Sequence, residues 1–556
     1  MLKDIDIARS ATMKPIAEIA AQLGIDPAVI ESYGQYKAKL PLRLIDEKKV
    51  KSAKLVLVSA ISPTPAGEGK TTVSIGLAQA MNRIGKKTTV VLREPSLGPV
   101  FGIKGGAAGG GYSQVLPMED INLHFTGDFA AIEKAHNLLS ALIDNNIQSK
   151  TSSLNIDPRT IVWKRVMDMN DRSLRNVVIG LGGTTSGVPR ETGFDITAAS
   201  EVMAILCLSK DLDDLKKRLG NIFVGYTYDK KPIYARDLKA NGAMAALMKD
   251  AIKPNLVQTI EGTPAVIHGG PFANIAQGTN SIVATKMGLS FSDYVVTEAG
   301  FGFDLGGEKF LDIKCRYAGI SPHAVVLVAT VRALKYHGGV AVKELITPNV
   351  DALIRGLENL GKHIENVRKF GLEPVVAVNR FPNDTSEEME ALKDYCKKAE
   401  VACEVVEVFT KGGEGGEALA RAVVEKVAAS KGTFTPIYDW NSSLEDKILT
   451  IAREIYGADA IEFSYKAHAD VKKITALGFD KLPVCIAKTQ KSLSDDAALL
   501  GRPRGFTLSI REIELAAGAG FVVPITGEMM RMPGLPDIPA AEHIDIDNEG
   551  NISGLS

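Results

Sequence analysis

The chain has 556 residues, of which 45% are hydrophobic and 24% are charged, and its formal net charge is −1. These values are typical of a globular protein with two to four domains, and they give no support to a nucleic-acid or membrane partner. The five cysteines form no C-x-x-C pair and no cluster with histidine, which argues against disulfide and zinc frameworks, so we expect a cytoplasmic protein.

The N-terminal region begins with a helical pattern. Apolar residues recur at spacings of three and four within 11–30, and Gly24 is placed to end the first helix. A polar and basic segment, 33–39, follows. We interpret this segment as a solvated loop rather than as one that faces phosphate.

The most informative motif is Pro-Thr-Pro-Ala-Gly-Glu-Gly-Lys-Thr-Thr at positions 63–72. An apolar, β-branched run at 55–61 precedes it and a helix-patterned segment at 73–83 follows, which is the order of strand, glycine-bearing loop and helix in a phosphate-binding loop. The usual pattern has glycine where this chain has Thr64, whereas an ordinary strand-to-helix turn would need one glycine and no lysine. The motif predicts a site for a nucleoside triphosphate.

The residues of this loop have predicted roles. The N–H groups of Gly67, Gly69, Lys70 and Thr71 can point into one concavity at the positive end of the helix, which favours an anion. Lys70 would reach the β- and γ-phosphate oxygens, and the Thr71 hydroxyl would bind Mg²⁺.

An arginine follows the next predicted strand, 88–92. In a doubly wound sheet, ligands lie at the carboxyl ends of the strands, which is where Arg93 falls. Its guanidinium could grip a carboxylate or a phosphate with two parallel hydrogen bonds. The alternative is a surface ion pair with Glu94.

The run 102–112 holds six glycines around a single lysine, Lys104. Clustered glycines are costly in conformational entropy, and no serine-rich linker composition accompanies them. We interpret this backbone, with Gly105 and Gly106 at its centre, as lying close against a ligand. His124 and Asp128 follow and offer a base and a carboxylate, and their role is left open.

Three later strands are predicted to end in polar or aromatic residues. Glu298 directly follows a buried strand and resembles the acidic residue that holds Mg²⁺ through water in phosphate-loop enzymes. Asn379 resembles the asparagine of a base-reading motif, but the spacing to the following aspartate differs, so it assigns no base. Phe381 and Phe409 each follow a predicted strand, the second at 403–409, and two such rings could clamp a flat heteroaromatic ligand, although core packing is the default for any single phenylalanine.

These elements predict an α/β fold. We expect a phosphate-loop NTPase-like doubly wound sheet domain at 1–345, a second α/β domain at 346–505, and a small, partly β C-terminal domain at 506–556.

Two long stretches, 102–112 and 328–339, resemble the signatures of the formate–tetrahydrofolate ligase family, also called formyltetrahydrofolate synthetase. The loop at 64–71 is similar to the ATP loop of that family, including the missing first glycine. The similarity extends from 33–39 to 524–536 and so covers essentially the whole chain.

The resemblance implies an ATP-dependent ligation of formate to tetrahydrofolate in one-carbon metabolism, which gives N10-formyltetrahydrofolate, ADP and phosphate through formyl phosphate. Lys70 and Arg93 would be catalytic, and residues 346–505 would contribute to the folate site. ATP would be bound by Thr64, Pro65, Ala66, Gly67, Glu68, Gly69, Lys70 and Thr71. The substrates would be bound by Arg93, Lys104, Gly105, Gly106, Phe303, Phe381 and Phe409, with Thr71 and Glu298 on the metal.

The resemblance also implies a homotetramer and activation by a monovalent cation, K⁺ or NH₄⁺. Phe409 departs from the better-known members, which carry tryptophan there, so a smaller ring would stack on the folate.

Two other functions compete with the ligase. The first is an ATPase that uses the nucleotide as a conformational switch and acts on a protein partner; the scattered cysteines argue against it. The second is a different ATP-dependent carboxylate ligase with an amine acceptor.

Overall fold

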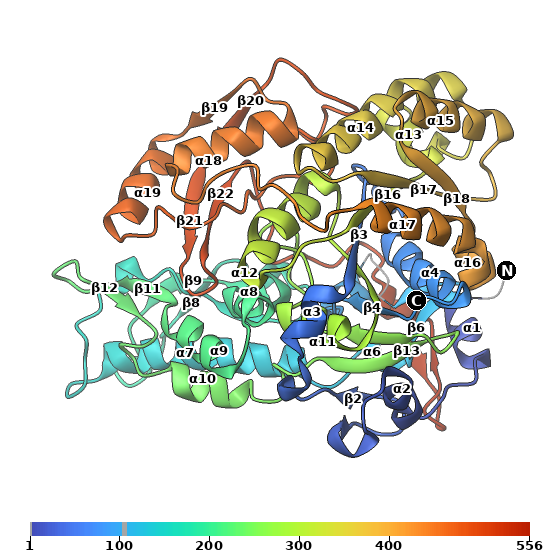
Figure 1. Ribbon diagram of the computed structural model, residues 1–556. Coiled ribbons are helices and arrows are strands. Elements are labelled where there is room, and N and C mark those ends of the chain that lie inside the picture. Colours follow the sequence, from blue (N-terminus) through green and yellow to red (C-terminus); the bar gives the residue numbers. More distant parts are fainter. Residues whose placement is uncertain (1–2, 103–107, 556) are drawn as a thin grey trace.

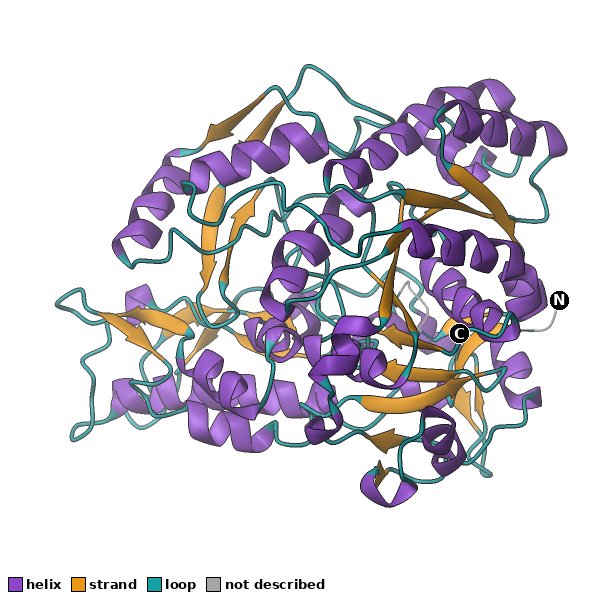
Figure 2. Cartoon of the chain, viewed as in Figure 1, coloured by secondary structure: helices purple, strands orange, loops and turns teal. Residues whose placement is uncertain are grey.

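A large, mostly parallel sheet runs through the centre of this mixed α/β protein (Figures 1 and 2). The computed structural model describes residues 3–102 and 108–555. The strands of the central sheet follow the order β1-β2-β13-β14-β4-β15-β3-β16-β17-β18, and β6 joins β5 to β13. Their bounds are β1 (Glu31–Ser32), β2 (Ala38–Lys39), β3 (Lys54–Ala60), β4 (Thr88–Leu92), β5 (Gly109–Gly110), β6 (Ser113–Leu116), β13 (Asn255–Thr259), β14 (Pro264–Ile267), β15 (Tyr294–Glu298), β16 (Ala324–Ala329), β17 (Pro374–Asn379) and β18 (Ala402–Val406).

The strands from β14 to β18 in this order are parallel, and all but the edge strand β18 are almost fully buried. In β3, Val56 and Val58 belong to one hydrophobic core, while Leu55 and Leu57 belong to the core on the opposite face. Such strands are continuous β-branched runs in the sequence because neither face meets water. This is why the sequence pattern predicts them well.

Helices cover both faces of this sheet. One face is covered by α1 (Asp4–Ser10), α4 (Lys70–Arg83), α6 (Met118–Asn122), α16 (Val408–Lys411) and α17 (Glu417–Ala429). The other face is covered by α2 (Ile16–Leu23), α3 (Glu47–Ser52), α11 (Ile282–Phe291), α13 (Val331–His337), α14 (Val350–Lys369) and α15 (Ser386–Lys398).

Two further regions lie beside the central sheet, at the lower left and upper left of Figure 1. The first contains α7 (Asp128–Gln148), α8 (Glu201–Leu208), α9 (Leu212–Gly220), α10 (Asn241–Leu247), β7 (Arg165–Met167), β8 (Val177–Ile179), β9 (Arg190–Thr192), β10 (Phe194–Ile196), β11 (Phe223–Tyr226) and β12 (Pro232–Tyr234). The second contains α18 (Leu444–Ile451), α19 (Tyr465–Ala476), β19 (Ala460–Phe463), β20 (Thr507–Ile510), β21 (Glu512–Ala516) and β22 (Phe521–Ile525). The remaining α-helices and strands are short: α5 (Leu97–Phe101), α12 (Arg316–Ala318), β23 (Asp545–Ile546) and β24 (Ile552–Ser553).

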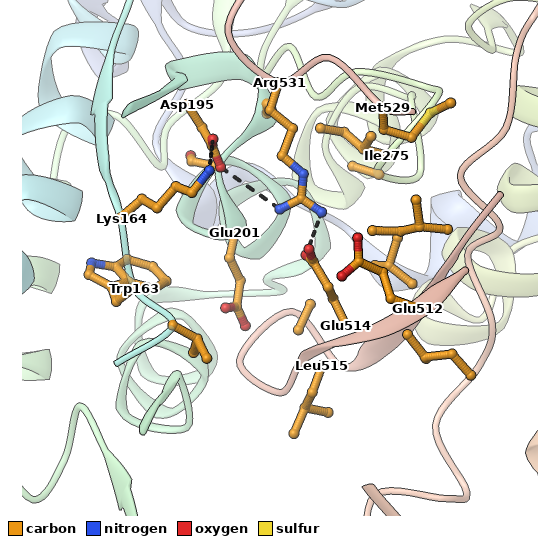
Figure 3. A pocket seen from close by; sticks show the side chains of 18 of the residues that line it. Trp163, Lys164, Asp195, Glu201, Ile275, Glu512, Glu514, Leu515, Met529 and Arg531 are labelled. Carbon is orange, nitrogen blue, oxygen red and sulfur yellow. Dashed lines mark hydrogen bonds and ion pairs between the residues drawn. The ribbon is translucent and has the colours of Figure 1, made fainter. Parts of the chain in front are cut away.

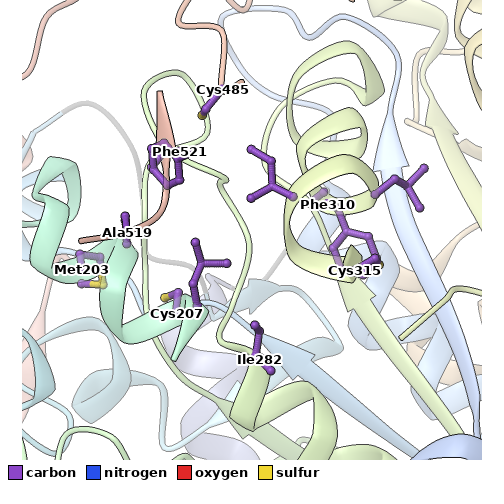
Figure 4. Packing of buried hydrophobic residues seen from close by; sticks show 14 of the residues in the cluster. Met203, Cys207, Ile282, Phe310, Cys315, Cys485, Ala519 and Phe521 are labelled. Atoms are coloured by element: carbon purple, nitrogen blue, oxygen red, sulfur yellow. The ribbon is translucent and has the colours of Figure 1, made fainter. Parts of the chain in front are cut away.

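The C-terminal strands are held by a shared core. Met203 and Cys207 of α8 lie in one cluster with Cys485 and Phe521, which come much later in the chain (Figure 4). The Cys485 N–H also donates to the Val522 carbonyl at 2.8 Å. All five cysteines are free thiols.

Several predicted elements are confirmed and two need correction. The strand expected at 403–409 ends at Val406, so Phe409 lies in the short helix α16. The segment 33–39 is not a solvated loop throughout, since it ends in β2, which pairs with β1 and β13, and Lys39 is fully buried there.

The sheet continues across position 345, where the first predicted domain ends, because β16 pairs with β17 in parallel. Likewise β20, which lies in 506–556, pairs with β19.

Within the described ranges, no helix is long and apolar enough to cross a membrane.

Candidate active site

Three of the predicted site features, the phosphate loop, Arg93 and Glu298, lie at the carboxyl ends of neighbouring strands. Because β3, β4, β15, β16, β17 and β18 run parallel, their carboxyl ends lie along the same edge. The phosphate loop follows β3, Arg93 follows β4, and Glu298 ends β15. Ligands of open α/β sheets bind at this edge. The strand order therefore places an anion-binding loop, a guanidinium and a carboxylate together.

The phosphate loop turns sharply into α4. Gly67 and Gly69 both have left-handed backbone, with φ of 79° and 72°, and α4 begins at Lys70 directly after Gly69. The first N–H groups of a helix have no partner within the helix, so they can bind an anion. The Gly67 N–H is already used, since it donates to the Thr64 carbonyl at 3.0 Å. The expectation that it points into the concavity is therefore not met.

Gly69 has no room for a side chain. A Cβ there would lie 2.6 Å from Nδ2 of Asn379, whereas Gly85, just past the other end of α4, has φ of 79° and no atom within 4 Å of the place of a Cβ. We expect Gly69→Ala to lower kcat/KM for ATP by about tenfold or more, because the loop must shift in addition to bearing left-handed strain. Gly85→Ala is the matched control, and it should cost about 1 kcal/mol of stability without changing ATP kinetics. Equal ATP kinetics in the two variants would contradict the assigned close approach.

Glu68 braces the loop from within. Its buried carboxylate accepts from the Thr64 N–H at 2.7 Å and from the Thr64 hydroxyl at 2.8 Å, and the Thr330 hydroxyl donates to its other oxygen. The loop thus replaces its missing first glycine by a threonine held through a carboxylate. Asn379 Nδ2 donates to the Glu68 carbonyl at 3.1 Å.

Two histidines hold the chain just before the loop. Nε2 of His337 lies 2.9 Å from the Ser62 carbonyl, and Nε2 of His363 lies 3.1 Å from the Ser62 hydroxyl. Burial lowers the pKa of His363 to about 4, so its imidazole is neutral at neutral pH. The chain leading into the loop is therefore fixed by buried polar contacts and not by apolar packing alone.

Arg93, Glu298 and Thr71 form a connected chain of contacts. The Thr71 hydroxyl donates to Oε2 of Glu298 at 2.9 Å, and Nη2 of Arg93 lies 3.6 Å from Oε1 of the same carboxylate. Glu298 is 1% exposed. Arg93 thus pairs with Glu298 and not with Glu94, so the alternative of a surface pair with Glu94 is wrong.

Glu94 lies in a separate buried group. Burial and the neighbouring carboxylate of Asp128 raise the pKa of Glu94 well above its usual range. Asp128 itself receives Nζ of Lys39 at 2.7 Å and Nδ2 of Asn255 at 2.8 Å. Asp128 therefore anchors β2, which lies between β1 and β13 in the sheet, while His124 is exposed.

The three predicted aromatic residues have different surroundings. The half-buried Phe381 lies against Arg332, whose Cζ is 4.0 Å from the ring centroid. Phe303 is fully buried and makes an edge contact with Phe370 at 5.9 Å between centroids. Phe409 borders the glycine run. Among the ring contacts of the described residues, Phe381 and Phe409 do not form a pair.

The described part of the glycine run packs against protein. A Cβ at Gly111 would lie 2.0 Å from the Phe409 carbonyl oxygen, and one at Gly109 would lie 2.3 Å from the Ser113 carbonyl oxygen. The Tyr112 N–H donates to the same Phe409 carbonyl at 2.8 Å. Protein backbone, not a ligand, requires these glycines. Lys104, Gly105 and Gly106 lie outside the described residues.

A cavity of about 970 Å³ lies elsewhere, between β10 and the hairpin of β21 and β22 (Figure 3). Nη1 of Arg531 lies 3.8 Å from Oδ2 of Asp195, and its Nη2 donates to Glu514. Lys164 also pairs with Asp195 at 3.4 Å. No phosphate-loop residue lines this cavity, and these charged groups are already paired. We therefore place the candidate active site at the carboxyl ends of the parallel strands and not in this cavity.

Three residues that shape the loop have no role in the sequence-based predictions. They are Asn379, which the sequence relates only to a base-reading motif, and Thr330 and Arg332, which lie within the stretch 328–339. Thr330 and Arg332 follow β16, which pairs with β3, and Asn379 ends β17, the next strand of the sheet. A polar residue at the carboxyl end of a buried parallel strand is the signal that could have identified them.

The chain is similar to known proteins over nearly its whole length. The family model described as formate–tetrahydrofolate ligase matches residues 2–556. A formate–tetrahydrofolate ligase of Psychrobacter sp. (strain PRwf-1) is 60% identical over 564 aligned residues, which cover 99% of this chain and 99% of that protein.

Proposed function

Since the chain belongs to the formate–tetrahydrofolate ligase family, whose members are ATP-dependent ligases of one-carbon metabolism, we propose that it forms N10-formyltetrahydrofolate through formyl phosphate at the carboxyl edge of the central sheet. The observation that carries this proposal is the chain of contacts from Arg93 through Glu298 to Thr71 at the start of α4. This chain of contacts connects Arg93, which would bind the carboxylate of formate, to Thr71 beside the phosphate loop.

The reaction proceeds in two steps. A formate oxygen attacks the γ-phosphorus of ATP, and the bond from that phosphorus to the β–γ bridging oxygen breaks, which releases ADP. N10 of tetrahydrofolate then attacks the formyl carbon, its proton is lost, and the carbon–oxygen bond to phosphate breaks. Phosphate is a far better leaving group than the oxygen of formate, so the first step activates the formyl group for the second.

The side chains supply position and charge. Lys70 would hold the β- and γ-phosphate oxygens while the N-terminus of α4 faces the same phosphates. Arg93 would orient the formate carboxylate towards the γ-phosphorus and then retain the formyl phosphate with two parallel hydrogen bonds. Arg93 is already held beside Glu298 before the substrates bind, which favours charge stabilisation in the transition state.

The residues present fit a magnesium ion. Mg²⁺ prefers oxygen ligands and usually combines one or two protein groups with water and substrate phosphates. Thr71 offers a hydroxyl, and Oε1 of Glu298 has no hydrogen-bond partner among the described residues. When bound, the ion would offset charge on the transferred phosphoryl group.

We expect Glu298→Gln to weaken the apparent affinity for Mg²⁺ about 10- to 100-fold, because it removes a charge next to the Thr71 hydroxyl. The measurement is the initial rate against Mg²⁺ concentration at fixed ATP. Glu344→Gln, on an exposed surface, is the matched control. An unchanged Mg²⁺ dependence in Glu298→Gln would remove this carboxylate from the metal site.

For the folate, we propose that Phe381 and Phe409 provide stacking surfaces and that Lys104, Gly105, Gly106 and Phe303 contribute to the substrate site. The half-buried ring of Phe381 supports its part. Phe303 would act from the core, since it is fully buried.

The larger organisation is also part of the proposal. We propose a phosphate-loop NTPase-like doubly wound sheet at 1–345, a second α/β domain at 346–505 that adds β17 and β18 to the same sheet, and a small β-rich domain at 506–556 whose strand β20 pairs with β19. The five free cysteines support a cytoplasmic location. A homotetramer and a site for K⁺ or NH₄⁺ are proposed from the family.

The test uses formate labelled with ¹⁸O. A formyl phosphate intermediate requires one labelled oxygen to pass to inorganic phosphate, and product must need ATP, formate and tetrahydrofolate together. Unlabelled phosphate alongside N10-formyl product would contradict the intermediate. ATP hydrolysis that ignores formate and folate would instead favour a nucleotide-switched ATPase.

A further inference from the structure

Arg332 makes three contacts that no catalytic role requires. It is the second residue of α13, whose cap Thr330 accepts from the Ala333 N–H and donates to Glu68. Nη2 of Arg332 donates to the Gly67 carbonyl, and its Nε lies 4.0 Å from Oε2 of Glu68. On its other side, the guanidinium stacks on Phe381. One planar group therefore touches both the phosphate loop and an aromatic ring.

The contact with Gly67 orients the loop. A trans peptide points its C=O and N–H in opposite directions, so holding the Gly67 carbonyl turns the Glu68 N–H away from Arg332. Asn379 does the same one peptide later, because it holds the Glu68 carbonyl and so orients the Gly69 N–H. These side chains set the direction of two consecutive loop donors.

The ring that Arg332 covers is itself held in place. The Phe381 N–H donates to Oδ2 of Asp384 at 2.8 Å, and the Asp384 N–H donates to the Phe381 carbonyl at 3.0 Å. Phe381 keeps part of its surface exposed. A ligand ring that stacks on Phe381 would therefore restrict the position of the Arg332 guanidinium behind it. Because this guanidinium donates to the Gly67 carbonyl, any shift in its position would also move that carbonyl.

We propose that Arg332 is a positioning residue that couples the phosphate loop to the Phe381 ring, so that ATP and tetrahydrofolate strengthen each other's binding. This rests on the proposed function, in which Phe381 contacts the folate. A lysine could keep the charge near Glu68, but it has no plane to stack on Phe381 while donating to Gly67.

The test compares Arg332→Lys with Arg380→Lys, the same substitution at a neighbouring exposed arginine that pairs with Glu407. The dissociation constant of MgATP is measured by calorimetry with and without tetrahydrofolate, in the absence of formate. We expect tetrahydrofolate to tighten ATP binding by at least about fivefold in the wild type and in Arg380→Lys. In Arg332→Lys the factor should fall close to one.

Phe381→Leu is the second variant, because it removes the ring and keeps the side chain of Arg332 that donates to Gly67. Measured at a tetrahydrofolate concentration that saturates each variant, it should also abolish the coupling, and the double variant should lose nothing further. Reciprocity provides an internal check, since ATP must tighten folate binding by the same factor.

Full coupling in Arg332→Lys or in Phe381→Leu would overturn the inference, and so would independent binding of the two ligands in the wild type. Each of these results leaves the proposed function standing as long as the wild type makes N10-formyl product. Absence of that product in the wild type would instead defeat the proposed function.

Discussion

Lys70→Ala should reduce kcat for N10-formyltetrahydrofolate formation by about 10³-fold or more. Lys70 is the first residue of α4 and lies in the phosphate loop, so its ammonium is the group proposed to offset charge on the β- and γ-phosphates. Removing one preorganised donor at a transition state typically costs about 10²–10³ in rate, and charge on phosphoryl groups makes the loss larger. The assay is acid conversion of the product to its methenyl form, which absorbs light.

The fold should survive this change. Alanine is the best helix former, and Lys70 is only half-buried, so α4 keeps its start. Lys216→Ala, on the exposed side of α9, is the matched control and should keep full activity. An unchanged melting temperature with lost activity would separate chemistry from stability. Full activity in Lys70→Ala would remove the lysine from the phosphate site.

The parts of the fold that follow from local pattern can be predicted from the sequence. The pattern predicts a strand at 88–92, and β4 lies there, because its five buried residues give a continuous β-type signal. It predicts a helical segment at 73–83, and α4 contains these residues and ends at Arg83. The phosphate loop is recognisable since its strand, glycines and lysine are adjacent in the chain.

The contacts that hold the loop cannot be predicted in this way. Asn379 and Glu68 are 311 positions apart, and Thr330 and Glu68 are 262 apart. Such pairs depend on strand order, which no local periodicity reports. The burial of Lys39 cannot be predicted from the sequence pattern either, because a lysine is buried only where a partner such as Asp128 lies beside it.

Phe409 illustrates how a tertiary contact overrides a local signal. The apolar residues up to 409 predict one strand, yet the strand ends at Val406. The chain turns there because the Glu407 N–H donates to the Gly415 carbonyl and the Phe409 carbonyl accepts from Tyr112. Glycines of the run 102–112 leave room for the Phe409 backbone to come close. The end of the strand at Val406 and the glycines of this run therefore have one cause, the contact between these two segments.

Arg93→Ala should lower kcat/KM for formate by about 10²–10³-fold, with a much smaller effect on KM for ATP. The guanidinium is proposed to grip the formate carboxylate, and alanine leaves that anion without its charged donor. Rates are measured against formate at saturating ATP and tetrahydrofolate. Arg43→Ala, at an exposed arginine, is the control for loss of a positive charge.

Arg93→Lys separates the two consequences of Arg93→Ala, which are the loss of the hydrogen bonds to formate and the loss of the positive charge beside Glu298. Lysine keeps a positive charge near the buried carboxylate of Glu298, but it cannot form two parallel hydrogen bonds to formate. Both variants should therefore lose formate efficiency, while only Arg93→Ala should also change the Mg²⁺ dependence, because it alone removes the charge beside Glu298. A normal response to formate in Arg93→Ala would exclude Arg93 from the formate site, and the contact with Glu298 would then be structural.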